Sequence, residues 1–156
     1  LLKSATEEDI SRVIIIHPGS GGREKCWFFE NFCEIAEKVK QSEFFPVFLF
    51  GPAEQERLDR ELIGRAENNF ICFEGLKLEE VVGLLACANG YVGNDSGVSH
   101  VAGAMELRTA AVFGPTDESE YGPLGPDVGV FKSNSNDFAG SPDQELISKI
   151  ATWVIK

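Results

Sequence analysis

Two short segments carry residues whose types and spacing could bind an anion. The first covers residues 17–27 and reads His-Pro-Gly-Ser-Gly-Gly-Arg-Glu-Lys-Cys-Trp. Glycines such as Gly21 let the backbone approach a ligand and point N–H groups at it. Ser20 adds a hydroxyl group and Lys25 adds a cation. The following helix is expected to begin near Trp27 and to turn its positive end toward the same space, so the segment suits a diphosphate.

The first segment matches known phosphate-binding fingerprints poorly. The Walker pattern G-x-x-x-x-G-K-[ST] does not occur in the chain. The dinucleotide pattern G-x-G-x-x-G would require glycine at position 24, where the chain has Glu24. By itself, the segment is equally compatible with an ordinary connection between a strand and a helix.

The second segment is Gly-Asn-Asp-Ser-Gly at residues 93–97, and it also joins a predicted strand to a predicted helix. Asp95 or Ser96 is expected to cap this helix by accepting a hydrogen bond from one of its first N–H groups. The other N–H groups of the first turn, including that of Gly97, face a second anion position. His100 follows on the same turn, near the same opening.

The same residues could also belong to two other kinds of site, a hydrolase active site or a metal site. The nucleophile elbow of a hydrolase is G-x-S-x-G, but Ser96 stands one position late in G-N-D-S-G. Asp95 and His100 lack a supporting carboxylate cluster, so no metal site is predicted. Asp95 is expected instead to hold loop N–H groups, to position Lys25, or to bind a sugar hydroxyl.

The four cysteines show no C-x-x-C spacing and are expected to be buried free thiols.

Residues after the second and third predicted strands are candidates for the nucleoside part of a ligand. An acidic residue after the second strand of a nucleotide-binding domain often accepts hydrogen bonds from ribose hydroxyls. Glu54 is the candidate and Glu56 is the alternative, although an exposed glutamate in a first helical turn is the simpler interpretation. Leu76, at the end of the third strand, could form an apolar wall for a base or belong to the core.

The elements that must position these residues alternate along the chain. Strand and helix signals recur at intervals of roughly twenty to thirty residues, as in βαβ units. The predicted strands span residues 13–17, 45–50, 71–73, 90–93, 109–113 and 128–131. The predicted helices span residues 28–39, 58–66, 78–88, 97–105 and 141–154. In the last helix we expect Ser141 as the N-cap, Pro142 in the first turn and Gln144 completing a capping box.

Apolar strands without polar alternation predict a parallel sheet that is covered on both faces. The expected fold class is α/β, a doubly wound Rossmann-like sheet whose ligands bind outside the carboxyl ends of the strands. The chain of 156 residues fits one domain, 1–156, with residues 1–12 expected to be a linker from a preceding domain. The formal net charge of −11 argues against nucleic acid and anionic membranes as partners. No apolar run is long enough to cross a bilayer.

Three motifs together resemble glycosyltransferase family 9, the ADP-heptose:lipopolysaccharide heptosyltransferases. They are HPGSG followed by K-x-W, then G-N-D-S-G-x-x-H-x-A-x-A, and finally FGPTD. The resemblance runs from about Val13 to Lys156. Members of this family have two Rossmann-like domains that face each other across a cleft, the GT-B arrangement. This chain resembles the second domain, which binds the nucleotide-sugar donor.

The resemblance implies roles for individual residues. Those that would contact the phosphates and sugar of the donor are Ser20, Lys25, Asp95, Ser96 and Gly97, with His100 beside them. Those that would contact the nucleoside or face the cleft are Glu54 at the ribose, Leu76 at the adenine, and Thr116 and Asp117 on the cleft loop.

The resemblance also implies the reaction of the whole enzyme. An inverting transferase would add heptose from ADP-heptose, or a related sugar, to the lipopolysaccharide core, in the cytoplasm and peripherally at the inner face of the inner membrane. Lys25 would stabilise the leaving diphosphate, and the general base would be an aspartate of the first domain. No cofactor and no metal are implied. Two other classes stay open: a nucleotide-binding module without transferase activity, and a hydrolase that uses Ser96.

Overall fold

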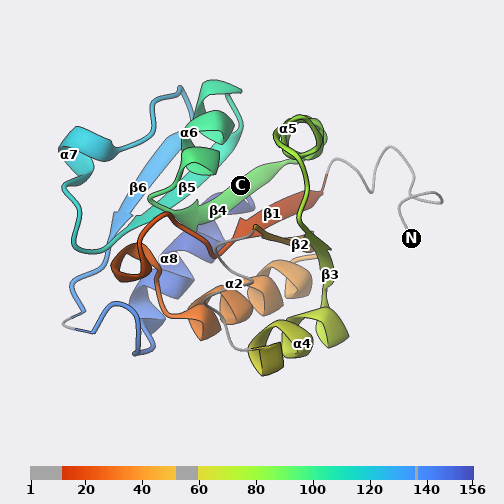
Figure 1. Cartoon of the computed structure of the whole chain (residues 1–156), viewed down its shortest axis with the longest axis horizontal. Coiled ribbons are helices and arrows are strands. Elements are labelled where there is room, and N and C mark those ends of the chain that lie inside the picture. Colours follow the sequence, from red (N-terminus) through yellow and green to blue (C-terminus); the bar gives the residue numbers. More distant parts are fainter. Residues whose placement is uncertain (1–11, 52–59, 136) are drawn as a thin grey trace.

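The chain forms one parallel sheet with helices on both faces (Figure 1). The computed structural model describes residues 12–51, 60–135 and 137–156. The strands are β1 (Val13–His17), β2 (Phe45–Phe50), β3 (Ile71–Glu74), β4 (Gly90–Asn94), β5 (Arg108–Phe113) and β6 (Val128–Lys132). They lie in the order β3-β2-β1-β4-β5-β6, and every neighbouring pair is parallel. The predicted doubly wound α/β fold is confirmed.

The helices form two layers. One layer contains α2 (Phe29–Gln41), α4 (Arg60–Asn69) and α8 (Gln144–Val154), and the other contains α5 (Leu78–Ala86) and α6 (Gly97–Ala104) (Figure 1). Two short helices, η2 (Arg23–Lys25) and α7 (Glu118–Tyr121), lie in loops that follow β1 and β5. The sequence patterns did not predict either short helix, because each is too brief to show a helical period.

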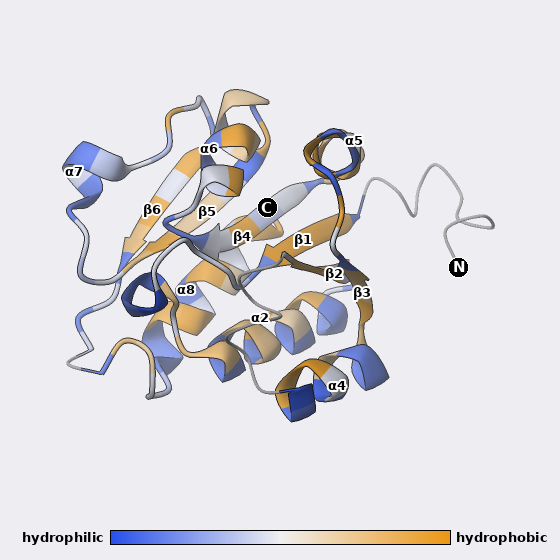
Figure 2. Cartoon of the chain, viewed as in Figure 1, coloured by the Kyte–Doolittle hydropathy of each residue, from blue (hydrophilic) through white to orange (hydrophobic). Residues whose placement is uncertain are grey.

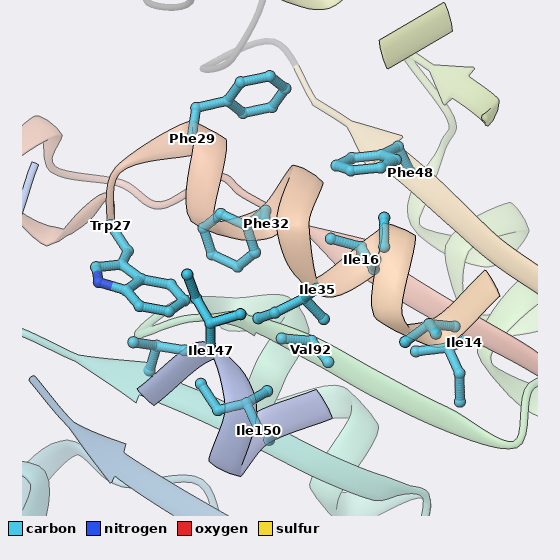
Figure 3. Packing of buried hydrophobic residues seen from close by; sticks show 14 of the residues in the cluster. Ile14, Ile16, Trp27, Phe29, Phe32, Ile35, Phe48, Val92, Ile147 and Ile150 are labelled. Carbon is cyan, nitrogen blue, oxygen red and sulfur yellow. The ribbon is translucent and has the colours of Figure 1, made fainter. Parts of the chain in front are cut away.

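The strands alternate their side chains between the two layers. Ile14 and Ile16 belong to the buried cluster that includes Phe32 of α2 and Ile150 of α8 (Figure 3). Ile15, between them, belongs to the cluster on the side of α5 and α6. Burying a side chain of this size contributes roughly 1.5–3 kcal/mol. Figure 2 shows the same division, with hydrophobic strands inside and hydrophilic residues on the outer faces of α2 and α4.

The start of α8 differs from the prediction. Asp143, not Ser141, is the N-cap, and its Oδ1 accepts a hydrogen bond from the Leu146 N–H at 3.2 Å. Ser141 Oγ instead donates to the carbonyl of Asp137 in the preceding loop. The Gln144 side chain donates to Glu34 of α2, so it makes no capping box. A carboxylate is favoured at the positive end of a helix, and Asp143 therefore sets the first turn two residues later.

The expectation of buried thiols was wrong. Cys26, Cys33 and Cys72 are only half-buried, and Cys87, directly after α5, is exposed; all four are free. Apolar neighbours in the sequence did not predict the burial of these thiols, because the burial of a side chain depends on which face of the helix or loop carries it. Within the described ranges, no helix combines the length and the apolar character that crossing a membrane requires.

Candidate functional site

The two glycine-rich segments lie at the point where the direction of winding reverses. β1 and β4 are neighbours in the sheet although β2 and β3 separate them in sequence. The chain leaves β1 toward α2 on one face and leaves β4 toward α6 on the other (Figure 1). The carboxyl ends of such strands diverge and open a crevice, which is where ligands of doubly wound sheets bind.

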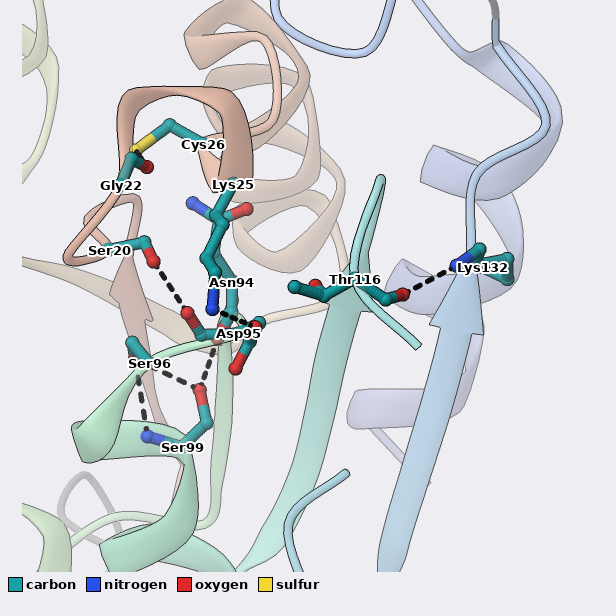
Figure 4. Close-up of polar contacts among 10 residues, drawn as sticks. All are labelled: Ser20, Gly22, Lys25, Cys26, Asn94, Asp95, Ser96, Ser99, Thr116 and Lys132. Atoms are coloured by element: carbon teal, nitrogen blue, oxygen red, sulfur yellow. Dashed lines mark hydrogen bonds and ion pairs between the residues drawn. The ribbon is translucent and has the colours of Figure 1, made fainter. Parts of the chain in front are cut away.

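The two turns are in direct contact. Ser20 Oγ donates to the backbone carbonyl oxygen of Asp95 at 2.6 Å (Figure 4). Ser20 is 5% exposed and Asp95 is 8% exposed, so the contact is sheltered from water. The predicted meeting of the two segments is therefore confirmed.

Asn94 fastens the first segment to the end of β4. Its Nδ2 donates to the Pro18 carbonyl at 2.7 Å, and its Oδ1 accepts from the Trp27 N–H at 3.0 Å. Asn94 has no exposed surface, so both backbone groups depend on this side chain for their hydrogen bonds. Asn94 was not among the site residues expected from the sequence. A short buried amide at the end of a strand carries no periodic signal.

Lys25 and Asp95 form an ion pair. Lys25 Nζ lies 2.8 Å from Asp95 Oδ2, and the lysine is 30% exposed. The hydrogen bond with Asp95 raises the pKa of Lys25, so the side chain stays cationic. The ammonium group also lies 5.6 Å from the centre of the Tyr121 ring, which belongs to α7. Of the three roles expected for Asp95, positioning Lys25 is the one that the structure displays.

A cavity of about 550 Å³ opens beside these turns. Its polar end is formed by the two turns, with His17, Ser20, Gly21, Ser96 and Gly97. Its apolar end is formed by side chains of β2, α5, α6 and the loop after β3, namely Leu49, Phe50, Leu76, Leu78, Val81, Val98 and Val101. A cavity with a few convergent polar groups and a large apolar wall is typical of a small-molecule site.

Five of the expected site residues therefore line one cavity: Ser20, Gly21, Leu76, Ser96 and Gly97. Leu76 follows β3 by two residues instead of ending it. Lys25 and Asp95 are not among the lining residues. His100 is exposed on α6 and does not line the cavity. Glu54 and Glu56 lie outside the described residues.

The helix end at the cavity belongs to α6 and not to α2. Ser96 caps α6 by accepting from the Ser99 N–H, and Ser96 and Gly97 both line the cavity. α2 begins only at Phe29, after η2, and contributes no lining residue in the described part of the chain. The Phe28 N–H donates to the Phe138 carbonyl. The start of α2 is therefore hydrogen-bonded to the loop before α8 and does not line the cavity. The expectation that the positive end of α2 faces the ligand was wrong.

The cleft-loop residues expected from FGPTD hold α7. Asp117 Oδ1 accepts from the Ser119 N–H at 2.9 Å and caps this helix. The Thr116 carbonyl accepts from Lys132 Nζ at 2.7 Å (Figure 4). Thr116 Oγ1 is buried without a hydrogen-bond partner among the described residues. Tyr121 of α7, whose ring lies next to the Lys25 ammonium group, thus brings this loop beside Lys25.

His17 is a lining residue that the sequence analysis missed. Its Nδ1 lies 3.1 Å from the Tyr91 hydroxyl and 3.5 Å from Ser96 Oγ. The sequence did carry a signal for this cluster, because a glycine inside a strand indicates that another group approaches the backbone closely. A Cβ on Gly93 would lie 2.2 Å from the Tyr91 hydroxyl, so this glycine makes room for the tyrosine. The Ser96 hydroxyl caps α6, and this structural role does not support its use as the nucleophile of a hydrolase.

Burial lowers the pKa of His17 to about 4. In the unfolded chain the imidazole takes up its proton near its ordinary pKa of 6.5. Between these two values the unfolded state binds more protons than the folded state. The free energy of unfolding should therefore decrease by about 3 kcal/mol as the pH falls from 6.5 to 4, and should level off below.

Urea unfolding of the wild type and of His17→Gln across this range measures the effect. The difference between the two proteins isolates His17, because the carboxylates contribute equally to both. Parallel stability curves would contradict a buried neutral imidazole.

The sheet order and the crevice at the reversal point define a Rossmann-type domain of the kind that forms half of a GT-B glycosyltransferase. Residues 2–150 match the family model described as glycosyltransferase family 9 (heptosyltransferase). The chain belongs to this family.

Individual relatives agree with this assignment. Lipopolysaccharide heptosyltransferase 2 of Salmonella typhimurium is 31% identical over 108 residues, which cover 66% of this chain and 31% of that protein. The structure of E. coli heptosyltransferase WaaC with ADP has a TM-score of 0.79 at 22% identity, over 97% of this chain and 47% of that one. WaaC with ADP-2-deoxy-2-fluoro heptose gives 0.72 at 22% identity, over 92% and 42%. The chain spans less than half the length of each of these proteins.

Proposed function

We propose that this chain is the donor-binding half of an inverting heptosyltransferase and holds ADP-heptose or a related nucleotide sugar. The observation that carries the proposal is the contact between the Ser20 and Ser96 turns at one end of a single cavity. Backbone N–H groups and the N-terminus of α6 converge there, and such an arrangement favours phosphate. The apolar end has the size and composition to receive a base.

The proposed chemistry is stabilisation of the leaving group. As the bond between the sugar and the diphosphate breaks, negative charge grows on the diphosphate. Lys25, held in position by Asp95, and the first N–H groups of α6 would stabilise that charge, and fixed dipoles of this kind need little reorganisation. The acceptor, a lipopolysaccharide core sugar, and the general base would come from a companion domain. Transfer would take place in the cytoplasm at the inner face of the inner membrane.

A ligand panel tests the proposal by thermal unfolding. ADP at millimolar concentration is expected to raise the melting temperature by several degrees, because a ligand that binds only the folded state stabilises it by mass action. Free sugars without a nucleotide should have no effect. If neither ADP nor UDP shifts the transition, the donor-site proposal is wrong.

A nucleotide-binding module without transferase activity would also respond to ADP. The two functions separate with ADP-heptose, since a donor site should bind the complete nucleotide sugar more tightly than ADP. Equal affinity for ADP and ADP-heptose would favour the module.

A further inference from the structure

The ammonium group of Lys25 is held between two loops. Its Nζ donates to Asp95 Oδ2 at 2.8 Å, directly after β4 (Figure 4). The same nitrogen lies 5.6 Å from the centre of the Tyr121 ring, which belongs to α7. Lys25 itself is the last residue of η2. One cation therefore joins the segments that follow β1, β4 and β5.

The hydrophobic core does not explain why the Tyr121 ring lies beside Lys25. The side chain is 47% exposed, and it belongs to neither of the two buried clusters of the described residues. The backbone of α7 sets its location, because the Tyr121 N–H donates to the Asp117 carbonyl and the Gly122 N–H to the Glu118 carbonyl, both at 3.0 Å. A Cβ on Gly122 would lie 2.6 Å from the Glu118 carbonyl oxygen, so glycine lets the chain turn tightly after Tyr121.

The two contacts restrain Lys25 in different ways. A lysine side chain has a flexible four-carbon stem, and a single ion pair leaves its ammonium group free to move around the carboxylate. The face of an aromatic ring attracts a cation, and Tyr121 supplies this attraction from α7. The ammonium group carries three hydrogens, and Asp95 is its only hydrogen-bond acceptor among the described residues. The other hydrogens can face the ring and a ligand.

Asp95 connects this cation to the cavity. Its backbone carbonyl accepts from Ser20 Oγ at 2.6 Å, while its carboxylate holds Lys25. Ser20 lines the cavity, and so does Ser96, the residue that follows Asp95 in the chain. The ammonium group is therefore anchored, through one residue, to the two turns that are proposed to bind the diphosphate.

We propose that Tyr121 is a positioning residue for Lys25, and that its ring holds the ammonium group against Asp95 and keeps it oriented for the diphosphate of the ligand. Tyr121 acts through Lys25 and does not touch the ligand. The inference rests on the proposed nucleotide-sugar function. Holding the cation in place beforehand removes part of the ordering cost of binding. Without the ring, Lys25 would also turn toward Glu24, whose charge acts on it as well.

NMR of protein with ¹³C-labelled lysine tests the contact without any ligand. The ring current of Tyr121 shifts the ε-CH₂ signals of Lys25, which Lys25→Met identifies by their loss. Tyr121→Leu should move these signals to the position of an exposed lysine, whereas Tyr121→Phe should keep them shifted. Lys40, whose Nζ lies 5.9 Å from the centre of the Phe70 ring, is an internal reference that should not change. Unchanged Lys25 signals in Tyr121→Leu would overturn the proposal.

Titration calorimetry with ADP measures the consequence for the ligand. Tyr121→Leu should weaken ADP about three- to tenfold, which is the range of a cation–π contact at a partly exposed site. Tyr121→Phe should bind like the wild type. Phe45→Leu is the matched control, since Phe45 is 43% exposed but lies at the amino end of β2, and it should leave ADP binding unchanged. Wild-type affinity in Tyr121→Leu, or an equal loss in Tyr121→Phe, would contradict the role of the ring.

A double-mutant cycle decides whether Tyr121 acts through Lys25. Lys25→Met has no ammonium group for the ring to hold, so adding Tyr121→Leu should not weaken ADP further. NMR titration suits this pair of proteins because it measures weak binding. A further loss of about three- to tenfold would mean that the ring contacts the ligand itself, and the positioning role would be wrong.

The outcomes keep this inference apart from the proposed function. A wild type that does not bind ADP would overturn the nucleotide-sugar function and with it the effect of Tyr121 on the ligand. The hold of the ring on Lys25 would still stand or fall on the ligand-free lysine signals.

Discussion

Lys25→Met should weaken ADP binding by roughly three orders of magnitude and AMP binding by only about tenfold. Methionine keeps the apolar stem beside Tyr121 but removes the ammonium group. Two effects combine: a charge-assisted hydrogen bond to the diphosphate is lost, and the Asp95 carboxylate is left buried and unpaired next to the anion. AMP lacks the second phosphate and loses less. Titration calorimetry with both nucleotides measures the difference.

Two further variants sharpen this result. Adding Asp95→Asn to Lys25→Met removes the unpaired carboxylate, so it should recover about tenfold or more of the lost ADP affinity. Lys132→Met is the matched control, since Lys132 is also paired with a carboxylate, that of Glu118 at 2.9 Å, but lies at the end of β6, two strands away from β4 and the Asp95 turn. It should bind ADP like the wild type. Equal losses of ADP and AMP in Lys25→Met would exclude the diphosphate contact.

Asn94→Ala should lower the free energy of unfolding by about 4 kcal/mol, because two buried backbone groups each lose a hydrogen bond. The same change frees the Ser20 turn from the end of β4, so ADP affinity should fall at least tenfold, on the order of the loss expected for a misplaced anion site. Urea unfolding and titration calorimetry on the same protein measure the two effects.

Asn31→Ala separates stability from site geometry. Asn31 is equally buried and also bonds two backbone groups, the Ser141 carbonyl at 3.4 Å and the Asp143 N–H at 3.3 Å. These groups lie at the start of α8, away from the residues that line the cavity. Asn31→Ala should destabilise the protein but leave the ADP affinity of the folded state unchanged. If both asparagine variants weaken ADP equally, Asn94 has no special role at the site.

Much of the fold could be predicted because its signals are local. β-branched runs such as residues 13–17 and the helical spacing of Phe32, Ile35 and Val39 depend only on neighbours within a few residues. Helix boundaries were harder to predict where two neighbouring polar residues could both serve as the N-cap. Ser141 and Asp143 both suit a helix cap, and the structure uses the one whose charge favours the helix dipole.

The candidate site was predictable in its parts but not in its assembly. Gly21, Ser20 and Ser96 are recognisable from the sequence, since glycine and small polar residues after a strand have few other uses. His17 and Asn94 were not recognised. Their roles come from Tyr91, Pro18 and Trp27, which approach them only after the sheet forms.

By itself, the amino-acid sequence determined the alternation of strands and helices, the two glycine-rich turns and the membership of a glycosyltransferase family. Only the tertiary structure decided that β4 pairs with β1, that the cavity's helix end belongs to α6, and that Lys25 pairs with Asp95. The physical reason is chain separation. Ser20 and Asp95 are 75 residues apart, and their contact depends on strand order, which hydrogen bonds between strands set and local residue preferences do not encode.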